Sequence, residues 1–227
     1  MRRVATLYSS SVGKKIAMAL SGVILFGFVL LHMLGNLKAF EGREAMDSYA
    51  EFLRAVGTPV VPEYGVLWAV RLLLLVALGV HATAAYQLWR QSRKARTQGY
   101  RKSRSQTFGY ASRTMRWGGV IVLAFVIYHL LHMTTGTVHP DFEYGSVYDN
   151  LVIGFQSIPV TAFYLVAVGA LSVHLHHGLW SVFATLGNQN PRLDRIRRPA
   201  AAAISIGLFV GYAIVPLAVL LGVLTLG

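Results

Sequence analysis

Histidines are the residues of this sequence whose type and spacing could do chemistry. Eight of them occur in a chain in which 55% of the residues are hydrophobic and only 13% are charged. Four successive apolar segments each contain at least one, at His32, at His81, at His129 and His132, and at His174, His176 and His177. Ionisable side chains are rare within long apolar segments and usually have a function there, so these histidines are the first candidates for a site. A single histidine in such a segment can also serve packing or hydrogen bonding alone.

The four segments place their histidines at two depths. With a helical rise of about 1.5 Å per residue, His32 and His129 lie about 20–25 Å from the nearest basic loop, and His81 lies about 13 Å from one. By the same rise His174 lies about 22 Å from the opposite end of its segment, so it shares the depth of His81. The sequence therefore predicts an outer pair, His32 with His129, and an inner pair, His81 with His174. Imidazole binds haem iron axially, so the two pairs predict two bis-histidine haems and a route for electrons across a bilayer.

The remaining histidines of these segments are assigned secondary or alternative roles. His132 lies one turn from His129 on nearly the same face, and we expect it to bond a haem propionate, a quinone or water. It could also replace His129 as the ligand. His177 shares a face with His174 and is a second candidate for contact with the haem, whereas His176 points to a different face. Either His176 or His177 could replace His174 as the ligand.

Three ionisable residues near the ends of the segments are further candidates. Arg71 lies early in the second apolar segment, where it needs an anion such as a haem propionate or a loop acid, unless its guanidinium reaches the surface. Glu63, just before that segment, is the candidate for a quinone or proton site, with a solvated loop acid as the alternative. His139 lies in a loop, where we expect it to be solvated.

Five apolar segments must position these residues. Each is long enough to cross a bilayer, for which about 20 residues suffice. They lie at about 16–37, 66–89, 117–138, 160–186 and 200–226. No segment alternates like a strand, so we predict an all-α membrane protein, a bundle of five transmembrane helices in a single membrane domain over residues 1–227. Between the segments, residues 43–56 predict a short amphipathic helix on the outer face, and residues 139–158 a second outer cap.

The loops differ sharply in charge. The chain has 21 basic and 9 acidic residues, and most of the basic ones lie in residues 1–15, 90–116 and 192–198. All of the acidic residues except Asp194 lie in the other loops. The positive-inside rule then predicts a cytoplasmic N-terminus and a C-terminus outside, with the basic loops able to dock a partner or meet anionic lipid. So little charge and so much hydrophobicity exclude a soluble nucleic-acid-binding protein and a disordered chain.

Four stretches resemble the diheme cytochrome b membrane-anchor subunit of bacterial succinate dehydrogenases and fumarate reductases. They are residues 9–37, ASRTMRWGG (111–119), FVIYHLLH (125–132) and HLHHGLWSVFATLG (174–187), and the likeness extends over nearly the whole chain. In that family each of the first four spans supplies one haem ligand, and the first span pairs with the third and the second with the fourth. The resemblance therefore implies that His32, His81, His129 and His174 bind the iron of two haem b groups.

The resemblance also implies partners and a location. The flavoprotein and iron–sulfur subunits of the same complex would carry the succinate or fumarate chemistry, and this subunit would pass electrons between them and a quinone, menaquinone, in the bacterial cytoplasmic membrane. The complex can form a higher oligomer. The chain contains no cysteine, so it cannot itself hold an iron–sulfur cluster, a disulfide or a thiolate zinc site.

Two other functions fit the same residues. A diheme cytochrome b can serve another quinone-linked dehydrogenase, such as a hydrogenase or a nitrate reductase, and differs only in its soluble partner. A transporter with intramembrane histidines is the alternative from a different class, and it predicts no haem. The direction of electron flow is open at this point.

Overall fold

The computed structural model describes residues 10–95, 106–185 and 191–226, and within these ranges every regular element is a helix. The elements are α2 (Ser11–Asn36), the short 3₁₀ helix η1 (Leu37–Glu41), α3 (Arg43–Ala55), α4 (Gly65–Lys94), α5 (Gln106–Met133), α6 (Val147–Gln156), α7 (Ile158–Thr185) and α8 (Pro191–Leu220). Five of them, namely α2, α4, α5, α7 and α8, are long and apolar enough to cross a membrane. The prediction of an all-α protein with five spans is therefore confirmed for the described residues.

Two of the predicted spans extend too far at their C-terminal ends. The span predicted at 117–138 ends as a helix at Met133, and the one predicted at 200–226 ends at Leu220. After α8 the backbone turns at Gly222, whose φ of 70° is the left-handed conformation typical of a glycine that ends a helix. Apolar residues continue beyond this turn, and hydrophobicity alone therefore placed the boundary too late.

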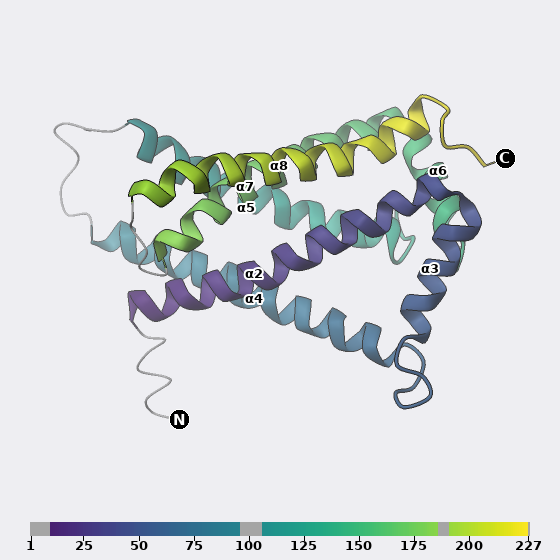
Figure 1. Cartoon of the computed structure of the whole chain (residues 1–227), viewed down its shortest axis with the longest axis horizontal. Coiled ribbons are helices and arrows are strands. Elements are labelled where there is room, and N and C mark those ends of the chain that lie inside the picture. The colour runs from purple at the N-terminus through teal and green to yellow at the C-terminus, as the bar shows by residue number, and fades with distance from the viewer. Residues whose placement is uncertain (1–9, 96–105, 186–190, 227) are drawn as a thin grey trace.

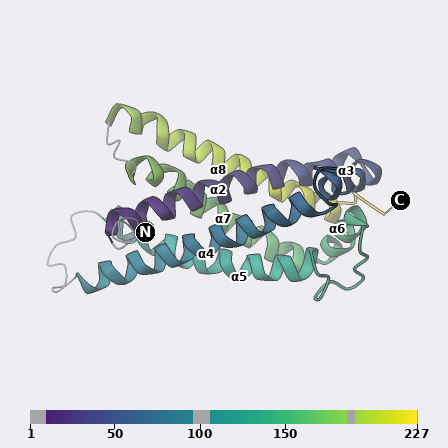
Figure 2. The same ribbon diagram turned by 90° about the horizontal axis from the view of Figure 1, so that it is seen from below.

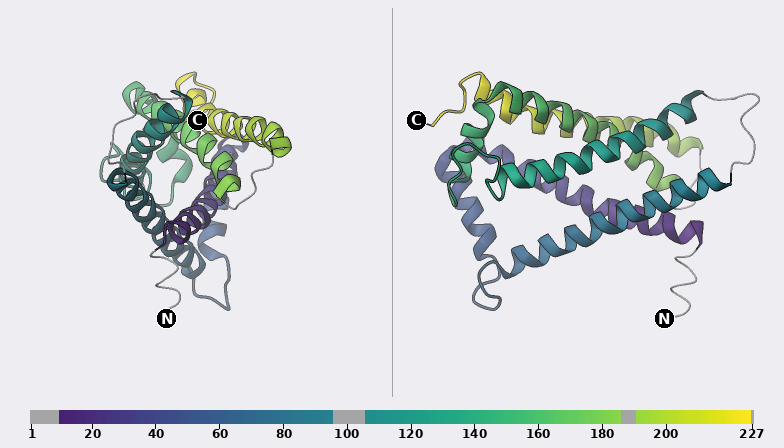
Figure 3. Two further views of the ribbon diagram at one scale, coloured as in Figure 1. Left: turned by 90° about the vertical axis from the view of Figure 1, so that its left-hand side faces the viewer. Right: turned by 180° about the vertical axis from the view of Figure 1, so that it is seen from behind.

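The long helices form two groups that run along the long axis of the molecule. Helix α2 packs along α4, and α7 packs against both α5 and α8 (Figure 1, Figure 2). Further contacts of α2 with α7 and α8 join the two groups. Among the described residues, α4 makes no extended contact with α5 or α7. The bundle is therefore closely packed on the α7–α8 side and loosely packed between α4 and the pair α5–α7 (Figure 3).

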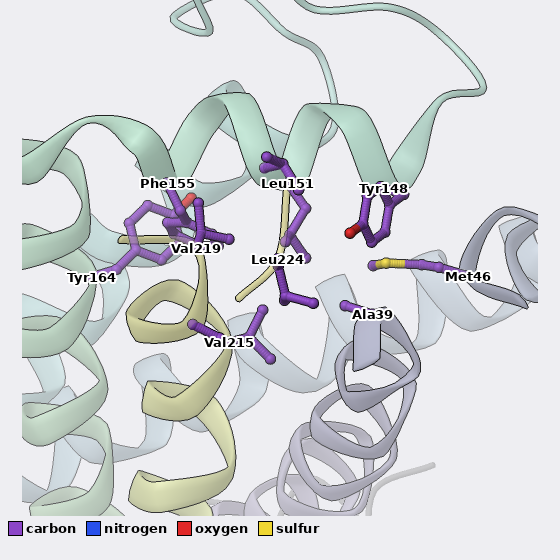
Figure 4. Close-up of a cluster of buried hydrophobic side chains, with 11 residues drawn as sticks. Ala39, Met46, Tyr148, Leu151, Phe155, Tyr164, Val215, Val219 and Leu224 are labelled. Atoms are coloured by element: carbon purple, nitrogen blue, oxygen red, sulfur yellow. The ribbon is translucent and has the colours of Figure 1, made fainter. Parts of the chain in front are cut away.

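The main cluster of buried hydrophobic side chains lies at one end of the bundle, where α3 and α6 are found, and we call it the α3/α6 end (Figure 1). Its members come from η1, α3, α6, α7, α8 and the residues after α8, and they include Met46, Leu151, Tyr164 and Leu224 (Figure 4). The backbone N–H of Tyr148 donates to Asp47 Oδ1 at 3.0 Å, which fixes α6 to α3. Leu224 shows why hydrophobicity continued past α8, because this residue folds back into the cluster.

The two predicted outer caps are present at this end as α3 and α6. The ion pair between Arg43 Nη2 and Asp149 Oδ1, at 2.9 Å, joins them. Helical spacing within residues 43–56 predicts an apolar face that includes Phe52, and this prediction is only partly correct. Met46 is the buried residue of α3, whereas Phe52 is 58% exposed.

Charge divides between the two ends of the bundle. The acidic residues of η1, α3 and the loops before α4 and α6 lie at the α3/α6 end, while Lys14 and Lys15 at the start of α2 and Arg93 at the end of α4 lie at the opposite end. This agrees with the alternation of spans from which we predict a cytoplasmic N-terminus, and the orientation itself stays a prediction. Some of the basic residues assigned to the inner loops, namely Arg2, Arg3, Arg96, Arg101, Lys102 and Arg104, lie outside the described residues.

Replacing Gly136 with alanine is expected to destabilise the α3/α6 end. Gly136 has a φ of 70°, and a Cβ atom there would lie 2.3 Å from the Phe142 ring. The left-handed conformation alone costs an alanine about 1–2 kcal/mol, and Phe142 must also move. Thermal unfolding of the purified protein in detergent should show a lower midpoint for Gly136→Ala than for the control Gly145→Ala. Gly145 also has a positive φ, 106°, but open space beside it. Equal midpoints would contradict the clash.

Candidate functional site

The predicted outer pair is brought together between α2 and α5. The ring centroids of His32 and His129 are 5.8 Å apart, and their planes are 76° from parallel. Phe28 stacks on His32 one turn along α2, and Phe125 lies 5.8 Å from His129 one turn along α5. Each imidazole thus packs against an aromatic neighbour on its own helix, and the two imidazoles approach each other from α2 and α5.

The predicted inner pair is brought together between α4 and α7. The ring centroids of His81 and His174 are 6.2 Å apart, with planes 67° from parallel. His81 Nδ1 lies 3.0 Å from the carbonyl oxygen of Met18. Because a carbonyl oxygen can only accept, Nδ1 carries the proton and Nε2 is the nitrogen left free to bind a metal. A hydrogen bond of this kind orients metal-binding histidines in proteins.

Glycines lie against both imidazoles of the inner pair. A Cβ atom on Gly22 of α2 would lie 3.2 Å from His81 Cε1, and one on Gly119 of α5 would lie 3.7 Å from His174 Cε1. The first distance is tighter than an ordinary side-chain contact, so any larger residue at position 22 would require the His81 imidazole to shift. The position of this imidazole therefore depends on a residue of another helix.

The alternative ligands His176 and His177 lie elsewhere on α7. Their rings are 5.4 Å from each other, and the ring that His81 approaches is that of His174. The structure thus places the rings of the four histidines near each other in the two predicted pairs. His176 and His177 lie in the following part of α7.

His139 is buried, although its position in a loop predicted a solvated side chain. It is 7% exposed because α6 folds over the loop that contains it. Its Nε2 donates to the carbonyl oxygen of Asn150 at 2.8 Å, and its Nδ1 accepts from the backbone N–H of Asp141 at 3.2 Å. Both ring nitrogens are therefore bound to backbone groups, and His139 serves to hold the loop to α6.

His132 has a partner that the sequence did not indicate. Its Nδ1 lies 3.0 Å from the hydroxyl of Tyr164, and the same hydroxyl lies 3.3 Å from Nδ1 of His129. His132 is 1% exposed, and its Nε2 has no hydrogen-bond partner in the described part of the chain. Tyr164 is itself buried and was missed because nothing in the sequence aligns α7 with α5 at this register.

Arg71 and Glu63 are not brought to the histidines by any hydrogen bond or ion pair of the described residues. The Arg71 guanidinium lies 5.0 Å from the ring centroid of Trp68, one turn nearer the α3/α6 end. Glu63 is exposed in the segment before α4. Its neighbour Tyr64 is hydrogen-bonded to Tyr144, and this bond raises the pKa of Tyr64 above its ordinary value.

The two pairs suit an iron that a macrocycle also holds. In the described residues no three of His, Cys, Asp and Glu lie close enough together to hold a metal ion by themselves. Two imidazoles bound to one metal from opposite faces, through bonds of about 2 Å, have ring centres about 6 Å apart. The separations of 5.8 and 6.2 Å agree with that requirement.

A comparison with protein families identifies the class of protein. A family model described as the succinate dehydrogenase/fumarate reductase transmembrane subunit matches residues 90–223, more than half of the chain. The chain belongs to this family. No curated protein and no solved structure matches the chain significantly.

The part of this transmembrane subunit that matches the family contains α5, α6, α7 and α8. It therefore includes one member of each histidine pair, His129 and His174, whereas His32 and His81 precede it. With five apolar helices and this family, the chain is a multi-pass membrane anchor of the succinate dehydrogenase/fumarate reductase type.

Proposed function

We propose that this membrane anchor is a diheme cytochrome b that transfers electrons between the iron–sulfur subunit of its complex and a quinone, menaquinone, in the bacterial cytoplasmic membrane. The observation that carries the proposal is the meeting of four histidines from four helices as two pairs, 5.8 and 6.2 Å between ring centroids. The family assignment favours this function over a transporter or the anchor of a hydrogenase or nitrate reductase.

Each pair has a defined task in the proposal. His32 and His129 would hold one haem and His81 and His174 the other, and haem with two imidazole ligands supplies one-electron transfer without an open site for oxygen. The Met18 carbonyl fixes which nitrogen of His81 is available. Phe28 and Phe125 pack beside the outer imidazoles and would restrict their rotation.

Other residues serve the propionates, the quinone and the partners. Arg71 is the proposed cation for a propionate, because no acidic side chain of the described residues pairs with it. His177 is proposed to lie near the inner haem. Glu63 is proposed to exchange protons between the quinone and solvent, since it is exposed at the α3/α6 end. The iron–sulfur clusters are assigned to a partner subunit, because this chain has no cysteine to bind a cluster. The flavin is assigned to the flavoprotein subunit that the family implies.

A reduced-minus-oxidised absorption spectrum of the purified complex tests the proposal. We expect a b-type alpha band and two haems for each covalently bound flavin, with a flavoprotein and an iron–sulfur subunit copurifying. A spectrum without the band would overturn the proposed function, and one haem per flavin would overturn the assignment of two pairs.

A further inference from the structure

One tyrosine connects the outer histidine pair to a third, buried histidine. The Tyr164 hydroxyl lies 3.3 Å from Nδ1 of His129 and 3.0 Å from Nδ1 of His132. The two histidines are one turn apart on α5, and Tyr164 reaches both from α7. Two imidazoles from one helix thus share a single hydroxyl of another.

The position of this hydroxyl is fixed by packing. Tyr164 is 5% exposed, and its ring meets those of Phe125 and Phe155 edge to face, at 5.0 and 4.9 Å between centroids. It belongs to the buried cluster of the α3/α6 end (Figure 4). The hydroxyl therefore cannot turn away to another partner without moving the ring out of the cluster.

The polarity of the chain follows from the proposed function, on which this inference rests. If Nε2 of His129 binds iron, its Nδ1 must carry the proton and donate to the Tyr164 oxygen. The single hydroxyl proton of Tyr164 is then donated to Nδ1 of His132. His132 must in turn carry its proton on Nε2, which is the buried atom without a partner in the described chain.

We propose that Tyr164 is a positioning residue that orients His129 and lowers the reduction potential of the outer haem. An acceptor on Nδ1–H makes an imidazole a stronger electron donor to iron, which favours the oxidised state. Donation by Tyr164 to His132 makes its oxygen a better acceptor, because successive hydrogen bonds polarise one another. The inner pair has a different acceptor, the Met18 carbonyl, so the two haems differ in what tunes them.

Spectroscopic redox titration of the purified complex tests this with Tyr164→Phe. We expect both haems to be retained, the midpoint potential of the outer haem to become more positive, and that of the inner haem to stay unchanged. The matched control is Tyr128→Phe, since this ring lies 6.0 Å from Tyr164 and stacks on His132 but has no hydrogen bond to His129. It should leave both potentials as they are.

A second variant keeps the inference testable if Tyr164→Phe fails to assemble. His132→Leu leaves Tyr164 in place and removes only the far acceptor, so a smaller positive shift of the same haem is expected. Two retained haems with unchanged potentials in either variant would overturn the role of Tyr164 and leave the proposed function standing. Absence of haem from the wild-type complex would overturn the proposed function itself.

Discussion

Single replacements of the four paired histidines by alanine will sort into two classes. His32→Ala and His129→Ala will each lose the same haem, and His81→Ala and His174→Ala will each lose the other. Each haem in the proposal depends on one ligand from either side, so removing one imidazole leaves its iron with an open position and its macrocycle weakly held. The haem-to-flavin ratio should fall from two to about one in every variant, and redox titration will show which midpoint is missing.

The control for this series is His176→Ala, because His176 lies on α7 two residues after His174. Within the described residues its ring contacts that of His177 and no other aromatic ring. This variant should keep both haems. If His174→Ala keeps both haems while His176→Ala or His177→Ala loses one, the inner ligand is misassigned. If His32→Ala and His129→Ala lose different haems, the pairing is wrong although the ligands are right.

Gly22→Val will remove the inner haem without changing any ligand. A Cβ atom added at this position would lie 3.2 Å from Cε1 and 3.3 Å from Nδ1 of His81, and valine adds two methyl groups beyond it. The imidazole must move and will lose its bond to the Met18 carbonyl. We expect about half of the b-type absorbance, with the outer haem at its normal potential. Gly22→Ala demands a shift of only a few tenths of an ångström, and it should keep both haems with an altered inner potential.

Gly79→Val is the matched control. Gly79 has nothing within 4 Å of where its Cβ would lie, and it is two residues from His81, about 200° around α4. The change is the same in chemistry and in helix propensity, but it lies on the opposite face. Retention of both haems at unchanged potentials in Gly22→Val would contradict the close approach of α2 to His81.

The helices and the pairing of histidines could be predicted from the sequence for a simple reason. Runs of apolar residues predict the membrane spans. The rise per residue of a helix then gives the depth of each residue in the membrane. Depth was enough to predict that His32 lies near His129 and His81 near His174, while the binding of one haem by each pair stays a prediction. Hydrophobicity cannot distinguish a residue that continues a span from one that folds back into a cap, and Leu224 is of the second kind.

Specific contacts between helices could not be predicted from the hydrophobicity and depth of single segments. Tyr164 lies in an ordinary apolar segment, and its importance depends on the rotation of α7 relative to α5. His139 was expected in solvent because it lies in a loop, but α6 covers it and the Asn150 carbonyl oxygen accepts a hydrogen bond from its Nε2. Depth follows from one helix at a time, whereas a hydrogen bond needs two helices in a defined register.

The position of the buried cluster at the α3/α6 end has a consequence for how the subunit matures. The caps α3 and α6 are tied to each other and to the C-terminal residues by protein contacts alone. Between α4 and the pair α5–α7 no comparable protein contact exists in the described residues. In the proposed diheme protein, the haem held by His81 and His174 would lie between α4 and α7 and would add contacts that the protein alone does not make there. Completion of this side of the bundle would then depend on haem insertion, since a ligand held only by the folded state stabilises that state.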